Sequence, residues 1–364
     1  MREDPWDLSL PELQAEAARL NNRRHGNRVT YVVNRNANFT NICTVGCSFC
    51  GFQRKASDAD AYDRTAGEVI ERLSLTPWVT EVCLQGGIHP GWRLEDYAAL
   101  VRSIKEHFPG IHVHAFSPME IEHMRRSSGR DLESVLGELI DSGLDTMPGT
   151  AAEILVDRVR GELSGNKLGA ATWEQIVRTA HGMGLKSTAT VMYGHIETWE
   201  DIREHFSILQ RIQEDTGGFT ELVPLAFIPY RNRLGSRMVP GRVESRDFAG
   251  FEQRSMERAQ RLYPLARVYF DHLIPNLQTS WVKLGPARAV ASLDWGCNDF
   301  GGTLYEESIT RESGGAHGEC LTPGEIRRLL LAAGWEPAER STTYRLLPRR
   351  EVPETRAPGL AAVV

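Results

Sequence analysis

Residues 30–52 read TYVVNRNANFTNICTVGCSFCGF, a stretch in which a β-branched run leads into three closely spaced cysteines. The run at residues 30–33 is typical of a β-strand. Cys43, Cys47 and Cys50 follow it in a C-x3-C-x2-C pattern, which is too compact to expect from six cysteines scattered along the chain. The sequence therefore places a cysteine-rich loop directly after a strand.

Such a group of three cysteines is compatible with three kinds of site. Buried, unreactive cysteines are one. A structural zinc ion is another, but it takes four ligands, and no second cysteine pair or His-rich segment follows. Three thiolates on a short loop suit a 4Fe-4S cluster, which then keeps one iron without a cysteine ligand. An iron of that kind binds a small molecule directly, and we favour this third interpretation.

Strand-like and helix-like segments alternate along the rest of the chain, a pattern typical of a parallel sheet covered by helices. We expect strands at residues 80–84, 111–116, 144–147, 187–192 and 219–225, and helices at residues 8–20, 68–75, 94–107, 131–142, 173–183, 199–214 and 248–263. Turn-rich segments follow the strands, and in a (β/α) barrel these loops carry the functional groups. The sequence therefore predicts an α/β, TIM-like barrel, full or partial.

We expect the chain to contain three parts. They are an N-terminal helical extension at residues 1–29, the barrel domain with C-terminal additions at residues 30–347, and a tail at residues 348–364. The tail is rich in Pro, Arg, Glu and Ala without periodicity, so we expect it to be disordered.

Composition excludes several classes of protein. The net charge of −6 argues against a nucleic-acid-binding protein, which is normally basic. No run reaches the roughly 18 apolar residues that a membrane span needs. The acidic start MREDPWDLSLPEL does not resemble a signal peptide, so we expect a cytoplasmic protein without disulfides.

The motif CTVGCSFC, with an aromatic residue before its last cysteine, resembles the cluster motif of radical S-adenosylmethionine (SAM) enzymes. The blocks EVCLQGGIHP, HVHAFSPMEI, GLDTMPGTAAEIL and CNDFGGTLYEESI are similar to the second-subunit family of FO synthase, over about residues 28–345. The resemblance implies a radical SAM barrel that transfers the 4-hydroxybenzyl group of L-tyrosine to 5-amino-6-(D-ribitylamino)uracil in deazaflavin biosynthesis. It also implies a 4Fe-4S cluster, SAM, an electron-donor protein and the first FO synthase subunit as a partner.

Site residues follow from the same blocks. Cys43, Cys47 and Cys50 are the expected cluster ligands. The residues that we expect to bind SAM are Phe49, Gly86, Gly87, Ser117 and Glu120. Phe49 is equally compatible with a core aromatic, and the two glycines with a plain turn after a strand. Glu120 is also suited to the first turn of a helix, where the dipole favours a carboxylate.

Catalytic candidates are polar residues expected near strand ends or on the following loops. Asp145, Tyr193, His195, Asn298 and Asp299 are the main ones. His114, Glu221, Arg231, Glu306 and His317 are further candidates. For each of them the alternative is a hydrogen-bonded structural group, which is common for buried polar residues.

The chain departs from the family pattern after the last predicted strand. Residues 226–238 read AFIPYRNRLGSRM, where the family typically has a Pro-Phe-Val-His-Gln stretch, and Gly51 and Cys297 stand where it usually has alanine. Pro-Leu-Ala-Phe at residues 224–227 resembles the aminofutalosine synthases of menaquinone biosynthesis. Two alternatives remain. One is an aminofutalosine synthase-like or other radical SAM enzyme that forms a C–C bond with a different acceptor, and the other is a zinc-stabilised binding protein without catalysis.

Overall fold

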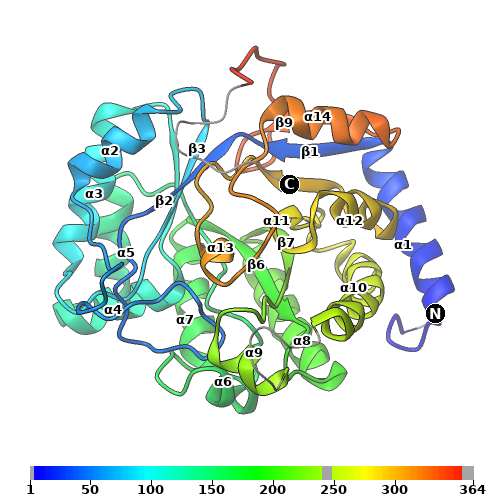
Figure 1. The fold of residues 1–364 in the computed structure, drawn as a ribbon, viewed down its shortest axis with the longest axis horizontal. Coiled ribbons are helices and arrows are strands. Elements are labelled where there is room, and N and C mark those ends of the chain that lie inside the picture. Colours follow the sequence, from blue (N-terminus) through cyan, green and yellow to red (C-terminus); the bar gives the residue numbers. More distant parts are fainter. Residues whose placement is uncertain (1–3, 240–247, 355–364) are drawn as a thin grey trace.

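A parallel β-sheet curved into a barrel forms the centre of the computed structural model, which describes residues 4–239 and 248–354 (Figure 1). Six parallel strands pair in chain order: β2 Asn34–Asn38, β3 Glu81–Gln85, β4 His112–Ala115, β5 Thr146–Met147, β6 Lys186–Tyr193 and β7 Phe219–Ala226. A second parallel sheet has the order β8–β1–β9, with β8 Asp299–Gly302, β1 Arg28–Val32 and β9 Glu336–Arg340.

Isolated bridges connect the two sheets. Leu277 pairs with Leu222 of β7, and Gln278 pairs with Asp299 of β8, both in parallel. Only Val33 separates β1 from β2, so the pairing continues from β7 through residues 277–278 and β8 back to the first strand. The predicted α/β, TIM-like barrel is confirmed.

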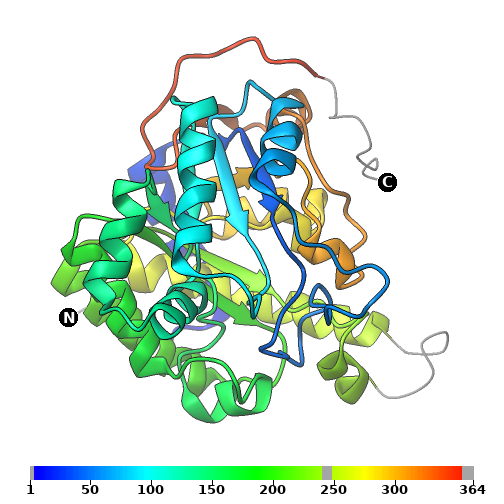
Figure 2. The ribbon, with the colours of Figure 1, turned by 90° about the vertical axis from the view of Figure 1, so that its left-hand side faces the viewer.

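Helices cover the outside of this barrel, as two perpendicular views show (Figures 1 and 2). Those of the barrel's first part are α1 Leu10–His25, α2 Ala66–Ser74, α3 Leu94–His107, α4 Pro118–Ser128, α5 Leu132–Asp141, α6 Asp157–Leu163, α7 Ala170–Gly182 and α8 Trp199–Thr216. The helices that follow β7 are α9 Arg233–Met238, α10 Phe248–Phe270, α11 Trp281–Leu284, α12 Pro286–Ala291, the 3-10 helix Ser292–Trp295, α13 Ile309–Glu312 and α14 Pro323–Ala332. Of these, α13 lies over the centre of the barrel and not on its outside (Figure 1). Among the described residues, no helix is both long and apolar enough to cross a bilayer.

Capping residues set the start of several helices. Thr65, Ser117, Thr198 and Thr322 begin α2, α4, α8 and α14, and each forms a capping box with the acidic residue three positions later. Such boxes satisfy backbone N–H groups that have no partner inside the helix. The start of α4 matters most here because it follows β4 at the carboxyl end of the sheet.

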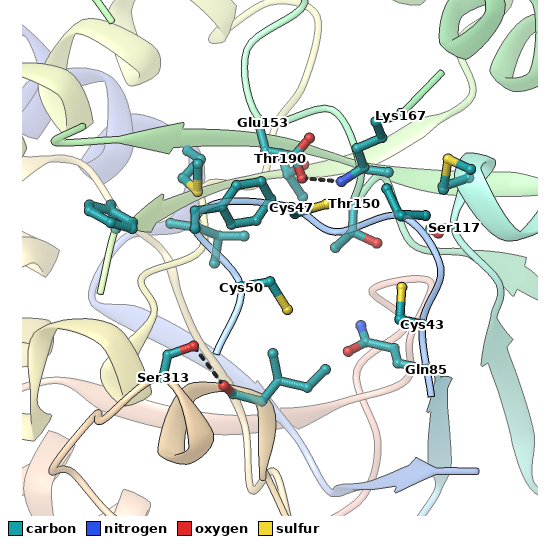
Figure 3. A pocket seen from close by; sticks show the side chains of 18 of the residues that line it. Cys43, Cys47, Cys50, Gln85, Ser117, Thr150, Glu153, Lys167, Thr190 and Ser313 are labelled. Atoms are coloured by element: carbon teal, nitrogen blue, oxygen red, sulfur yellow. Dashed lines mark hydrogen bonds and ion pairs between the residues drawn. The ribbon is translucent and has the colours of Figure 1, made fainter. Parts of the chain in front are cut away.

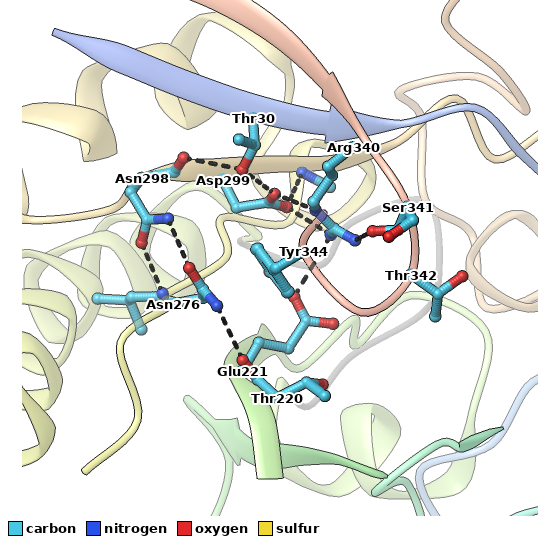
Figure 4. A network of polar contacts seen from close by, with 12 residues as sticks. Thr30, Thr220, Glu221, Asn276, Asn298, Asp299, Arg340, Ser341, Thr342 and Tyr344 are labelled. Atoms are coloured by element: carbon cyan, nitrogen blue, oxygen red, sulfur yellow. Dashed lines mark hydrogen bonds and ion pairs between the residues drawn. The ribbon is translucent and has the colours of Figure 1, made fainter. Parts of the chain in front are cut away.

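The amino-terminal end of the barrel is closed by a buried polar network, drawn in Figure 4. Arg340, the last residue of β9, donates to Asp299 at 2.5 and 2.9 Å. Tyr344 donates its hydroxyl to Glu221, and Thr342 donates to Glu81 at 2.6 Å. Because the carboxylates stand at or near the start of β3, β7 and β8, the C-terminal segment seals the end opposite to the cysteine loop.

The two ends of the described chain pack on the barrel. Asp271, which follows α10, accepts from Arg23 of α1 at 2.9 Å. Residues 348–354 contain no helix or strand, but Arg350 donates to Glu339 and, at 3.2 Å, to the carbonyl of Trp78. The remaining tail, residues 355–364, lies outside the described residues.

Candidate active site

A cavity of about 270 Å³ opens at the carboxyl ends of the six paired strands. It is lined by the cysteine loop and by the segments that follow the strands (Figure 3). Its polar lining residues are Cys43, Cys47, Cys50, Gln85, Ser117, Glu120, Thr150, Glu153, Lys167, Thr190, Lys283 and Ser313. This is the end where (β/α) barrels carry their functional groups.

The three cysteines surround one open space in the cavity (Figure 3). All three are free. The backbone N–H of Cys43 donates to the carbonyl of Arg54, and that of Thr44 donates to the carbonyl of Ile88 in the segment after β3, each at 3.0 Å. No group of three or more His, Cys, Asp or Glu residues within residues 4–239 and 248–354 is arranged around a single metal ion. Sulfurs spread around a cavity fit a cluster, where each binds a different iron, better than one zinc ion.

Glu120 lies in the cavity wall as part of the α4 capping box. Its Oε2 accepts from the backbone N–H of Ser117 at 2.7 Å and from the Ser117 hydroxyl at 2.8 Å. Its Oε1 is buried without a hydrogen-bond partner. Burial raises the pKa of Glu120 to about 7, against hydrogen bonds from Ser117 and from the backbone N–H of Gly86, which lower it. A carboxylate in the cavity wall with few hydrogen bonds suits a ligand that carries an ammonium group.

Gly86 and Gly87 permit close packing after β3. A Cβ on Gly87 would clash with the carbonyl of Ile42 and lie 3.0 Å from the Cβ of Cys43. A Cβ on Gly86 would enter the ring of Phe39, although Gly86 also lines the cavity. Gly87 therefore places the cysteine loop, and only Gly86 is exposed to a ligand in the cavity.

A buried ion pair in the cavity wall was not predicted from the sequence. Lys167 donates to Glu153 Oε1 at 2.7 Å, and its ammonium lies 5.3 Å from the ring centre of Phe49. Burial lowers the pKa of Lys167, but Glu153 and the Cys47 thiol outweigh it, so the net pKa is raised. Lys167 is thus a positive charge beside the cysteines. No spacing signal marks this pair, because the two residues come from different loops.

Backbone strain is concentrated near the same cavity. Phe116, Ala151 and Glu153 have φ values of 61°, 63° and 42°, which L-residues rarely adopt. The three residues lie in the segments after β4 and β5. Strain of this kind is common at functional sites, where surrounding structure maintains it.

Two predicted catalytic residues, Asp145 and Tyr193, are placed away from the cavity. Asp145 precedes β5, so the expectation that it ends a strand is wrong. Its carboxylate pairs with Lys105 at 2.5 Å near the amino-terminal end of the barrel. Tyr193 does end β6, but Thr190 and Met192 line the cavity, and alternate residues of a strand face opposite sides. Tyr193 instead faces Tyr263 of α10, with ring centres 6.3 Å apart.

The other three main candidates also have structural partners. His195 is buried between Glu197, 3.2 Å from its Nδ1, and the carbonyl of Met192. Asn298 accepts from Arg267 at 2.6 Å, and Asp299 binds Arg340, both at the closed end of the barrel (Figure 4). The structure does not bring these residues to the cysteines.

The further candidates are dispersed. His114 and Glu221 lie toward the closed end, where Thr146 and Tyr344 bind them. Glu306 pairs with Arg35 at 2.5 Å in a separate charged cavity. Arg231 is exposed. His317 lines a second cavity beside the first.

Known structures share this fold. Methylornithine synthase superposes with a TM-score of 0.66 at 16% identity, over 90% of this chain and 89% of that one. The FeFe-hydrogenase maturase HydG from Carboxydothermus hydrogenoformans gives a TM-score of 0.65 at 13% identity, over 93% of this chain and 75% of that one.

Residues 37–209 match the Radical SAM superfamily, and residues 224–355 match the CofH/MqnC C-terminal region. The barrel and the cysteine-lined cavity, together with these matches, identify the chain as a radical SAM enzyme. The chain is 47% identical to the 5-amino-6-(D-ribitylamino)uracil–L-tyrosine 4-hydroxyphenyl transferase of Methanopyrus kandleri, over 88% of this chain and 84% of that protein. It is 44% identical to transferase 1 of Methanosarcina acetivorans, over 93% and 88%. The chain belongs to the family of these 4-hydroxyphenyl transferases.

Proposed function

We propose that the protein is a radical SAM transferase that cleaves L-tyrosine and couples its 4-hydroxybenzyl fragment to 5-amino-6-(D-ribitylamino)uracil. One observation carries the proposal: the three cysteines of the radical SAM motif line one cavity together with Ser117 and Glu120 at the start of α4. The identity to transferases of that name supports the choice of substrates.

Cys43, Cys47 and Cys50 would hold a 4Fe-4S cluster and leave one iron free for SAM. Such a cluster would supply reducing chemistry for cleavage of the SAM sulfonium. The donor set fits, because three thiols and no fourth cysteine line the cavity among the described residues.

The chain's own residues bind and confine the reactants. Glu120 Oε1 accepts a hydrogen bond from the SAM ammonium, and Phe49 packs against its adenine. Lys167 and Lys283 supply positive charge for substrate carboxylates. Apolar side chains at Val45, Ile88, Met119 and Leu225 exclude water, which protects a reactive radical from side reactions.

The family resemblance implies the order of bond changes. Tyrosine loses a hydrogen atom from its amino group to the 5′-deoxyadenosyl radical, which becomes 5′-deoxyadenosine, and its Cα–Cβ bond breaks to leave 2-iminoacetate. The resulting 4-hydroxybenzyl radical adds to C5 of the uracil, and the adduct radical then gives up one electron, to an acceptor such as the oxidised cluster, and one proton. Because both substrates are held in one site, the benzyl radical does not have to meet its acceptor by diffusion.

Two protein partners complete the proposal: an electron donor for the cluster and the first FO synthase subunit, which closes the deazaflavin ring. The chain matches FO synthase of Mycobacterium tuberculosis at 44% identity over only 39% of that protein. The part of that protein outside the match is where we propose that the ring-closing chemistry lies.

An anaerobic product assay tests the function. Reconstituted enzyme, reductant, SAM and tyrosine are incubated with the diaminouracil and, in competition, with the acceptor of aminofutalosine synthase. We expect the diaminouracil adduct by mass spectrometry. Formation of 5′-deoxyadenosine without this adduct would instead favour the aminofutalosine-type alternative, and a colourless zinc protein without iron would contradict both.

A further inference from the structure

A second cavity, of about 380 Å³, lies beside the cysteine cavity. It is bounded by residues 226–230 after β7, by α10, by the α11–α12 segment and by residues 315–317. Ala226, Phe227, Ile228 and Lys283 line both cavities. The two spaces therefore share a wall, and the segment that departs from the family pattern forms part of it.

The cysteine cavity does not have room for every reactant. Sites for one ligand of moderate size usually occupy about 300–1,000 Å³. The first cavity measures about 270 Å³, and in the proposed function it receives the cluster and SAM. The second cavity is within the usual range, and its lining contains neither a cysteine nor Glu120. A third reactant thus has space directly beside the first two.

The lining of the second cavity changes from apolar to polar along its length. The residues next to the shared wall are apolar and buried: Phe227 is 3% exposed, Phe251 5% and Leu284 5%. The polar residues are more accessible, with the side chains of Glu252 and Arg288 exposed by 41% and 51%. Such a gradient orients a ligand that has an aromatic end and a polyhydroxylated end.

The polar groups of the second cavity lie close to one another. Tyr230 donates its hydroxyl to Glu252 Oε1, and Arg288 lies 4.0 Å from Glu252 Oε2. Gly285, with φ of 85°, gives space to the His317 ring, which a Cβ there would meet at 2.9 Å. Carboxylate, guanidinium and imidazole groups together accept from and donate to a row of hydroxyls.

We propose that this second cavity is the acceptor site. The heterocycle of a ribitylated diaminouracil packs against Phe227 and Phe251, and its ribityl hydroxyls bind Glu252, Arg288 and His317. This orientation puts the reacting ring beside the shared wall and Lys283, next to the cavity in which the benzyl radical forms. The assignment rests on the function proposed above.

Binding measurements without reductant test the site. The ribitylated diaminouracil and 5,6-diaminouracil, which lacks the hydroxyl chain, are dialysed against reconstituted wild type, Glu252→Gln and Glu257→Gln. Glu257 lies on the same helix but is exposed and does not line the cavity. We expect Glu252→Gln to weaken binding of the ribitylated compound about tenfold and to leave 5,6-diaminouracil unchanged, since one charged hydrogen-bond acceptor is lost. Glu257→Gln binds both compounds as wild type does.

A variant that fills the second cavity provides an independent test of the site. Ala287 is exposed and lines the cavity, so Ala287→Phe is expected to fold with normal iron content and to lose binding of both compounds. Wild-type affinity for the ribitylated compound in both variants would overturn the acceptor site. Failure of wild type to form the adduct would instead contradict the proposed function, which separates the two claims.

Discussion

Ser117 directs two hydrogen bonds to one oxygen of Glu120, at 2.7 Å from its backbone nitrogen and 2.8 Å from its hydroxyl, while the other oxygen, Oε1, has no partner. Both residues line the cysteine cavity. A single carboxylate therefore caps α4 with one oxygen, while the other oxygen is buried in the wall of the cavity. In this geometry the role of Glu120 as a helix cap is compatible with a role in ligand binding.

Replacement of Glu120 by glutamine tests that free oxygen. Glutamine keeps an acceptor for the cap but removes the charge, so we expect SAM affinity of the reconstituted protein to fall about tenfold or more. Equilibrium dialysis with SAM measures it. The matched control is Glu68→Gln, the same capping position in the exposed start of α2. Equal loss in both variants would contradict the assignment.

The stability of the apoprotein should report the same carboxyl group. Its pKa is raised from 4.5 to about 7 by burial, so the folded state favours the protonated form. The resulting stabilisation is present below about pH 4.5 and is lost as the pH rises to about 7. Urea unfolding across this range should show wild type losing stability relative to Glu120→Gln. If the difference in unfolding free energy between the two proteins does not change with pH, the raised pKa of Glu120 is disproved.

Gly87→Ala should displace the cysteine loop. The added Cβ would clash with the Ile42 carbonyl and press on Cys43, so we expect poor iron and sulfide incorporation after reconstitution. Gly110→Ala is the control, because no atom lies within 4 Å of its added Cβ. Iron content and the visible absorption of the cluster measure the effect. Normal loading of Gly87→Ala would show that the loop tolerates the shift.

Asp299→Asn should destabilise the closed end of the barrel. It leaves Arg340, 2% exposed, without its main partner, which costs about 3 kcal/mol in the free energy of unfolding. The exposed pair of Arg178 with Asp215 is the control, and Asp215→Asn should cost less than about 1 kcal/mol. Denaturant unfolding compares the two. If folded Asp299→Asn binds SAM normally but forms no adduct, Asp299 has a catalytic role after all.

Periodicity and β-branched runs were sufficient to predict the central elements. The helix at residues 94–107 coincides with α3, and strands were expected within a few residues of β3, β4, β6 and β7. β2 was missed because its sequence, NRNAN, is polar, although all five residues are buried. Its side chains face partners distant in sequence, such as Asn34 with Glu81 at 2.9 Å, which local patterns do not reveal. For the same reason β8 and β9 were not expected.

The site was predictable where residues are adjacent in sequence. The cysteine motif, Gly86, Ser117 and Glu120 all line one cavity. Lys167, Glu153 and Lys283 were missed because they meet only through the fold. Asn298 and Asp299 lie in a block similar to the transferase family, but they bind Arg267 and Arg340 at the opposite end. A block of sequence that resembles an enzyme family therefore contains structural residues as well as site residues.

The most direct test of the central claim follows the carbon atoms of tyrosine. Reconstituted enzyme is supplied with SAM, reductant, the ribitylated diaminouracil and tyrosine labelled with ¹³C on its ring and Cβ only. The account predicts an adduct that carries the whole label, and an unlabelled two-carbon fragment derived from iminoacetate. A product that retains the tyrosine Cα, or an acceptor recovered without label while 5′-deoxyadenosine accumulates, would contradict it.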